Sequence, residues 1–480
     1  MKELIDQTIQ YLKKKGVDYA DLRHIRKEYE SVKVKNGKVE GISRSQDQGF
    51  GIRVIANGAW GFASSSVSSE AEMARIADKA IEIAKASAIT KKEDVKLSEV
   101  QPYKDKYSSK FEIDPLSVAL DKKIDLLIKC SEILTKDKRV KVAELGIDSF
   151  HTEKVFASTQ GAFIEQDIVE CGAGMTANSA DEKDIQRRSY PNSFGGDYAT
   201  RGWEFIEEIN LLGNADKVRE ESISLLSAES CPDTTTDIII LGNQMALQVH
   251  ESCGHPTELD RVLGTEISLA GGSFMTIDKL NKLKYGSDKV NIVADATVEG
   301  GLGSFGYDDE GVKAQKTYLI ENGLFVGYQT SRETAVVLNQ TSNGTMRAEG
   351  WNRIPLIRMT NINLEPGQWK LEDLIADTEN GLLLDTNKSW SIDDKRLNFQ
   401  FGLEIAWEIK NGKLGRIYKN PVYTGITPEF WNSCDAVCNR NYWHVWGVPN
   451  CGKGEPMQVM HVAHGTAPSR FRNVKVGVTK

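Results

Sequence analysis

The chain has 480 residues, of which 40% are hydrophobic and 27% are charged. This composition is close to that of folded globular proteins, so it excludes a disordered tail and a coiled rod. Its 60 basic and 68 acidic residues give a net charge of −8, which excludes an overall positive field that would recruit nucleic acid or an anionic membrane. At about 150 residues per domain, the length predicts roughly two to four domains.

The first residues of the chain predict an intracellular location. Glu3 and Asp6 occur before any apolar segment of a signal peptide could form, and no run of 18 uncharged apolar residues is present. We therefore expect a cytoplasmic protein that is not inserted in a membrane. The seven cysteines are odd in number, so at least one cannot pair within the chain, and reduced thiols are expected.

The first part of the chain predicts an antiparallel sheet with helices. Apolar residues at helical spacing predict a short first helix that ends at Gly16. The pairs at 36–37 and 57–58 are both Asn-Gly and lie between alternating strands, which predicts two hairpins. Ser69 and Glu72 have the spacing of a capping box and predict the start of a long helix.

The next segment repeats this mixture of helices and strands. Pro115 predicts the start of a second amphipathic helix, because proline is favoured in the first helical turn. Strands are predicted from Val140 to Met175, broken by a turn at residues 159–161, and residues 214–230 predict a further helix. Grouped helices and strands of this kind indicate the α+β class.

A polar break that begins at Cys231 predicts the boundary between two domains. It precedes the buried-looking strand Ile238–Leu241, and farther along two more Asn-Gly pairs, at 322–323 and 411–412, lie between alternating strands. We therefore predict an N-terminal α+β domain (1–230). The predicted C-terminal domain (231–480) is rich in antiparallel β structure and contains a helix with the candidate metal ligands.

That helix ends in the strongest chemical signal of the sequence, two histidines that flank Glu251. On a regular helix His250 and His255 would point about 140° apart. Gly254 permits unusual backbone angles and Pro256 disfavours helical angles at His255, so we expect the helix to end or bulge and to return His255 beside His250. Two histidines and a carboxylate suit a catalytic zinc site with Glu251 as general base, although hydrogen-bonded histidines at a helix end would have the same spacing.

The residues themselves leave the third metal ligand open. Cys451 lies in a glycine-rich loop, where Lys453 could lower the pKa of its thiol. His461 and His464 form a competing pair. Cys253 would be crowded between two ligands, so we expect it to pack in the core.

Two further cysteines have a plainer interpretation. Cys434 and Cys438 are four residues apart in a predicted helix after Pro428, a spacing more typical of one buried face than of half a zinc site.

The sequence resembles the TldD/PmbA family of metallopeptidases. Two motifs carry the resemblance: His-Glu-Ser-Cys-Gly-His-Pro-Thr-Glu at 250–258 and Asn-Cys-Gly-Lys-Gly at 450–454. The chain is similar to the TldD-type subunit, which keeps the metal motif that PmbA-type (TldE) subunits lack. The resemblance implies that His250, His255 and Cys451 bind zinc and that Glu251 is the general base. It also implies a paired assembly that encloses the active site in a chamber.

The leading hypothesis is a zinc-dependent peptidase that hydrolyses unfolded polypeptides or short peptides with metal-activated water. Its partner would be a second copy of the chain or a PmbA/TldE-like subunit, and neither nucleic acid nor a membrane is expected to bind. The first alternative is a non-catalytic scaffold or regulatory subunit with a structural metal that binds a partner protein, for which a fourth ligand such as His461 or His464 would be needed. The second is a cysteine nucleophile at Cys451 with His464 as its base.

Overall fold

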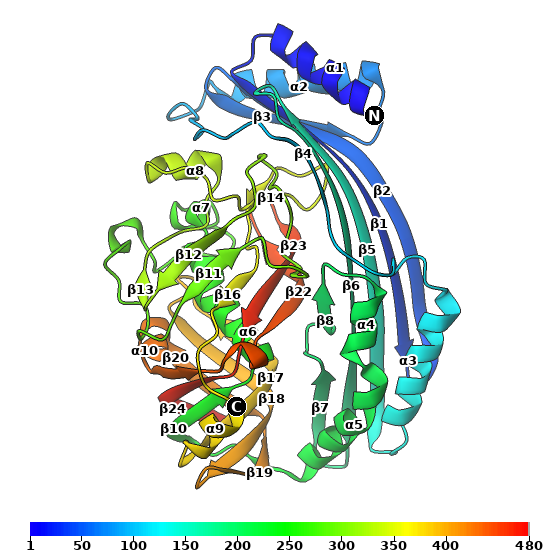
Figure 1. The fold of residues 1–480 in the computed structure, drawn as a ribbon, viewed down its shortest axis with the longest axis vertical. Helices are drawn as coiled ribbons and strands as arrows, with labels where there is room; N and C mark the ends of the chain where they lie inside the picture. Colours follow the sequence, from blue (N-terminus) through cyan, green and yellow to red (C-terminus); the bar gives the residue numbers. More distant parts are fainter. Residues whose placement is uncertain (479–480) are drawn as a thin grey trace.

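The computed structural model describes residues 1–478, which form an α+β protein built around two large sheets (Figure 1). In residues 1–478 the first sheet has eight strands, in the order β3-β2-β1-β5-β6-β4 with β7 and β8 both paired to β6. All pairs in it are antiparallel except the parallel pair of β4 and β6. Its strands are β1 (Tyr19–Lys35), β2 (Lys38–Ala56), β3 (Ala59–Ser65), β4 (Lys104–Ser108), β5 (Val140–Ser158), β6 (Phe163–Ala180), β7 (Ile185–Tyr190) and β8 (Asp197–Ala199).

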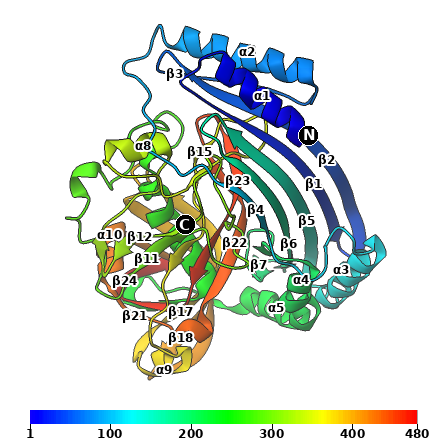
Figure 2. The ribbon, with the colours of Figure 1, turned by 45° about the horizontal axis from the view of Figure 1, so that its top comes forward.

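Helices pack at the two ends of this curved sheet (Figure 2). One apolar cluster joins the first two helices to β1 and β2, and a second joins the next three to β5 and β6. The helices are α1 (Lys2–Lys14), α2 (Glu70–Ser87), α3 (Leu120–Leu134), α4 (Trp203–Ile209) and α5 (Leu211–Ser227).

The second sheet, also of eight strands in residues 1–478, has the order β17-β10-β24-β20-β18-β19-β9, with β21 paired to β24. Most of its pairs are antiparallel, as expected for this half of the chain. Its strands are β9 (Glu229–Ser230), β10 (Thr234–Ile240), β17 (Asn380–Ile392), β18 (Asn398–Lys410), β19 (Lys413–Lys419), β20 (Pro421–Ile426), β21 (Cys434–Val437) and β24 (Ser469–Val478). The predicted domain boundary after residue 230 stays a prediction.

Smaller elements complete the C-terminal half. One sheet has the order β13-β12-β11-β16, and two hairpin-like pairs join β14 to β15 and β22 to β23. These strands are β11 (Ile292–Asp295), β12 (Lys316–Glu321), β13 (Leu324–Phe325), β14 (Met346–Arg347), β15 (Leu356–Ile357), β16 (Ile362–Leu364), β22 (His444–Lys453) and β23 (Gln458–Thr466). The α-helices are α6 (Gly242–Val249), α7 (Leu259–Val262), α8 (Arg332–Val337), α9 (Leu371–Ala376) and α10 (Thr427–Asn432). No helix of residues 1–478 has both the length and the apolar character needed to cross a membrane.

The turn and cap signals of the sequence are confirmed. Asn36 and Asn57 adopt positive φ angles of 49° and 54° at the tips of the β1–β2 and β2–β3 hairpins. Asparagine and glycine tolerate this region because steric cost there is small for them. The Ser69 side chain accepts a hydrogen bond from the Glu72 backbone at 3.3 Å, which caps α2.

Two element predictions were wrong. Helix α3 begins at Leu120, not near Pro115, because the Asp114 side chain accepts a hydrogen bond from the Leu116 backbone and closes a turn instead. The segment with Cys434 is strand β21, not a helix, because it pairs with β24 after α10 has ended. Both Cys434 and Cys438 are buried, as expected.

Helix α6 is buried along its whole length, and this burial positions the candidate site. It packs against β17 of the second sheet and against β23, and all eight of its residues are buried. A fully covered helix of this kind is held on several sides, so the residues that follow its C-terminus have a fixed position. Those residues begin with His250.

Candidate metal centre

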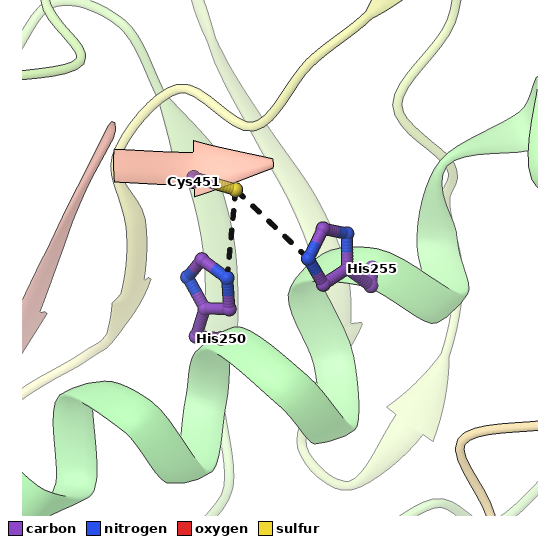
Figure 3. A group of neighbouring side chains, drawn as sticks. All are labelled: His250, His255 and Cys451. Atoms are coloured by element: carbon purple, nitrogen blue, oxygen red, sulfur yellow. Dashed lines mark hydrogen bonds between the residues drawn. The ribbon is translucent and has the colours of Figure 1, made fainter. Parts of the chain in front are cut away.

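Three side chains from distant parts of the sequence converge after α6. The Cys451 Sγ atom, on β22, lies 3.5 Å from His250 Nε2 and 3.9 Å from His255 Nε2. Figure 3 marks these two contacts with dashed lines. One ligand atom from each residue lies within 4.8 Å of the other two, and all three side chains are buried. Among residues 1–478, no other group of three or more histidine, cysteine or acidic residues brings its ligand atoms together in this way.

The two histidines share one face because the helix makes a π turn between them. Residues His250–Gly254 form this turn, and the His255 backbone N–H donates to the His250 carbonyl, five residues earlier. A wider turn absorbs the extra residue that would rotate His255 away in a regular α-helix. The expected bulge is therefore confirmed.

The reason we gave for that bulge was wrong. Gly254 and His255 both have right-handed helical angles, with φ of −55° and −61°, so neither the freedom of glycine nor the following proline moves the backbone out of the helical region. Glycine instead makes room here, because a Cβ atom at position 254 would lie 2.2 Å from Met359 Sδ. A larger residue would therefore have to displace the Met359 side chain.

Hydrogen bonds orient the Nε2 atom of each histidine toward Cys451. His464 Nδ1 lies 3.0 Å from the Ile362 carbonyl, so it carries the proton and leaves His464 Nε2 as an acceptor for His250 Nδ1 at 2.8 Å. His255 Nδ1 in turn lies 2.9 Å from the Glu258 carboxylate, which accepts its proton. Both tautomers leave Nε2 with a free lone pair, the state required of a metal ligand.

The charge distribution favours a thiolate at Cys451. Although burial acts to raise it, the pKa of Cys451 lies well below its ordinary value because His250 and the Arg358 guanidinium face the sulfur. Burial lowers the pKa of His255 and of His464 well below the ordinary value, which favours neutral rings. Burial also acts to lower the pKa of His250, but the neighbouring Cys451 outweighs it and raises that pKa.

The three side chains fit a zinc ion. With Zn–S near 2.3 Å and Zn–N near 2.0–2.1 Å, tetrahedral angles place sulfur and nitrogen about 3.6 Å apart. The two distances from Cys451 are close to this value. Two imidazoles and a thiolate are also ligand types that zinc accepts, and three protein ligands would leave one position for water.

Glu251 follows the first histidine and is held by Arg396. Its Oε2 atom accepts a hydrogen bond from Arg396 Nη1 at 2.8 Å, and both side chains are mostly buried. Arg396 belongs to the loop between β17 and β18, where it has a φ of 62°. The loop is fixed by the Arg396 carbonyl, which accepts from Thr427, and by the Asp393 carboxylate, which accepts from the Leu397 backbone.

A buried charge cluster lies beneath His255. Lys453 Nζ lies 2.7 Å from Asp260 and 3.5 Å from both Glu258 and Glu266. Arg261 lies 3.1 Å from Glu266. Glu258 contacts both His255 and Lys453, so the charged residues of this cluster help to fix the position of the His255 imidazole.

The other candidate residues have different contacts. His461 lies outside the group of three side chains and hydrogen-bonds Glu170 of β6 at 2.9 Å. Because His464 bonds His250 and a carbonyl, it neither adds a fourth ligand nor lies in place as a base for Cys451. Cys253 packs in the core, as expected.

Sequence reasoning did not identify the residues that support the ligands. Glu258 could have been found, since a carboxylate three residues after a helical histidine can reach it. Arg396 and the orienting role of His464 had no local signal, because each is brought to the site by a contact more than 100 residues away in sequence.

Models of one protein family match most of the chain. Residues 234–477 match the PmbA/TldA metallopeptidase C-terminal domain, residues 20–84 match its domain 1, and residues 113–226 match its central domain.

Full-length relatives and a solved structure agree with this match. A metalloprotease of Methanocaldococcus jannaschii is 31% identical over 91% of this chain and 92% of its own. A zinc metalloprotease TldD homolog of Saccharolobus solfataricus is 22% identical, over 97% of this chain and 99% of its own. The crystal structure of TldE from Thermococcus kodakarensis has the same fold, with a TM-score of 0.74 at 17% identity over 99% of this chain and 100% of that one.

Proposed function

The chain belongs to the PmbA/TldD family of metallopeptidases, and from this premise we propose that it is a zinc-dependent peptidase with Glu251 as its general base. Its substrates are unfolded polypeptides or short peptides. The observation that carries the proposal is the convergence of the His250, His255 and Cys451 ligand atoms within 4.8 Å of one another. The name of the Saccharolobus relative supports zinc as the metal.

A zinc ion bound there supplies a Lewis acid for the scissile carbonyl and lowers the pKa of a bound water. The protein's own residues do the rest. Arg396 holds Oε2 of Glu251, which leaves Oε1 to take a proton from the attacking water and to pass it to the departing amine. Glu258 and His464 keep the two imidazoles in the tautomers that present Nε2.

The test separates the base from the ligands. Glu251→Gln should keep about one zinc per chain and lose peptide cleavage by at least about a hundredfold, because general base catalysis contributes about 10²–10⁴. Cys451→Ala should lose both zinc and activity. Metal content by mass spectrometry and cleavage of an unstructured peptide are measured in each, with the exposed Glu321→Gln as matched control. Wild-type cleavage rates in Glu251→Gln would remove Glu251 from the mechanism.

The scaffold alternative has less support. It needs a closed site with four protein ligands. The two candidates for the fourth ligand, His461 and His464, both hydrogen-bond to other groups. The relatives are named metalloproteases.

The proposal includes a paired assembly in the cytoplasm. The partner is a second copy of this chain or a PmbA/TldE-like subunit, and the shared fold with TldE supports the second choice. Sedimentation of the purified chain, with and without such a subunit, would distinguish the two. Cell fractionation would test the location.

A further inference from the structure

A cavity of about 340 Å³ lies between the first sheet and the C-terminal half. Its walls come from β1, β2, β5 and β6 on one side and from β14, β23 and the loop at residues 304–309 on the other. This volume is in the range of small-ligand sites. One wall residue, Met460, is the cross-strand partner of Cys451, so the cavity adjoins the hairpin of the candidate metal centre.

The acidic groups around this cavity already have partners. Asp309 pairs with Lys154 at 2.7 Å, and Glu170 bonds His461 at 2.9 Å. Asp308 accepts from three backbone N–H groups, and Glu349 accepts from the Val459 backbone. Glu28 pairs with Arg26 at 2.5 Å, and Asp47 accepts from Trp351 Nε1 at 2.9 Å. Each of the six carboxylates that line the cavity therefore has a partner other than Lys27 and Arg347.

Two cations of the cavity have no such partner. Lys27, on β1, donates to the Glu349 carbonyl, and Arg347, on β14, donates to the carbonyls of Met359 and His461 at 2.9 and 2.7 Å. Neither forms an ion pair with a carboxylate in residues 1–478. Burial lowers the pKa of Lys27 and lowers that of Arg347 to about 10, and the charges of Glu170 and Asp309 offset only part of this effect.

Arg347 also connects the cavity to the metal centre. One of its acceptors is the carbonyl of Met359, whose side chain packs at Gly254 between the two histidines.

We propose that Lys27 and Arg347 form a subsite that binds an ionised carboxylate of the substrate peptide. The inference rests on the proposed peptidase function and adds a substrate preference to it. The carboxylate has two sources, the free C-terminus of a short peptide or an acidic side chain. Either would supply the direct ion-pair partner that the two cations lack, through charge-assisted hydrogen bonds.

The test measures binding separately from cleavage. Zinc-loaded Glu251→Gln protein is titrated into three fluorophore-labelled peptides of the same unstructured sequence: a free C-terminal acid, its amide, and an amide with one internal glutamate. Fluorescence anisotropy gives each Kd. The titrations are repeated with Lys27→Met, with Lys27→Arg, and with Lys33→Met, which removes an exposed lysine from the same strand.

We expect a carboxylate-bearing peptide to bind about tenfold to a hundredfold more tightly than the plain amide, as one charge-assisted bond implies. Lys27→Met should abolish this preference, and the other two variants should keep it. A preference for the free acid assigns the terminal carboxylate, and one for the internal glutamate assigns the side chain.

Equal Kd values for all three peptides, or a preference that survives in Lys27→Met, would overturn the subsite. Cleavage of the plain amide by the wild-type protein is scored separately. If no cleavage is found while the binding preference is intact, the proposed peptidase function is contradicted and the subsite is not.

Discussion

Two buried charge clusters in this molecule each contain three carboxylates but have different cations and different surroundings. In each, one of the carboxyls has a pKa that burial raises to about 7. One cluster lies beneath the candidate ligand His255, and the other joins β7 of the first sheet to β17 and β18 of the second. The first consists of Lys453 and Arg261 with Glu258, Asp260 and Glu266, and the second of Arg188 with Glu221, Asp385 and Glu404.

The clusters differ in how completely their polar atoms are paired. Glu258 Oε1, Glu266 Oε1 and Arg261 Nε are buried without a hydrogen-bond partner beneath His255. In the part of the chain that the structure describes, no such atom occurs in the cluster of Arg188, where Ser189 and Thr386 supply further bonds. The cluster between the two sheets thus has all its hydrogen bonds, whereas the cluster beneath the candidate metal centre contains atoms without a hydrogen bond, as proteins often do at functional sites.

Removal of the cation should be most harmful where pairing is complete. Arg188→Met leaves three carboxylates without their counter-charge, so we expect the free energy of unfolding to fall by about 3–5 kcal/mol. Urea denaturation measures the change, and Arg187→Met, at an exposed neighbouring position, is the control. A loss no greater than that of the control would mean that the cluster does not hold the sheets together.

The raised pKa of Glu404 predicts a dependence of stability on pH. The folded protein keeps a proton that the unfolded chain releases above its ordinary pKa of 4.5, so the contribution of Glu404 to stability falls as pH rises from about 4.5 to about 7 and is constant above that. At about 1.4 kcal/mol per pKa unit, the change is about 3 kcal/mol.

The Glu404→Gln variant has no ionisable group at this position, so its free energy of unfolding should not show this fall between pH 4.5 and pH 7. Urea denaturation of the wild type and the variant at pH 4.5 and pH 8 provides the comparison. Parallel pH profiles for the two proteins would contradict the assignment.

Removal of Glu258 should affect metal binding more than folding. Glu258→Ala removes the acceptor of His255 Nδ1 and one carboxylate of an incomplete cluster. We expect zinc affinity to fall by about 10–100-fold, equivalent to about 1.4–2.7 kcal/mol. Competition with a zinc chelator measures it, with Glu321→Ala as the control. Unchanged affinity would show that Glu258 does not orient the ligand.

Sequence reasoning succeeded where the cause of a structure is local. Asn36 and Asn57 mark hairpins because the cost of positive φ is a property of the residue itself. The prediction failed at Pro115, where the Asp114 side chain competes with the first helical turn, and at Cys434, where pairing with β24 decides the structure.

The candidate site divides in the same way. His250, His255 and Glu251 form a recognisable local motif, and the family resemblance was needed to add Cys451 from a strand about 200 residues away. The contacts of Arg396, His464 and Lys27 depend on how the sheets pack, and no periodicity in the sequence encodes that packing.

The π turn at residues 250–254 also bears on how the length of this segment could vary. The π turn accommodates one residue more than an α-helical turn does. Removal of one residue from the turn would therefore restore an α-helical turn and leave both imidazoles on the same side of the helix. A deletion elsewhere in α6 would instead rotate every later residue by about 100°. A deletion of one residue between His250 and His255 would therefore keep the following residues on the same face, whereas a deletion within α6 would not.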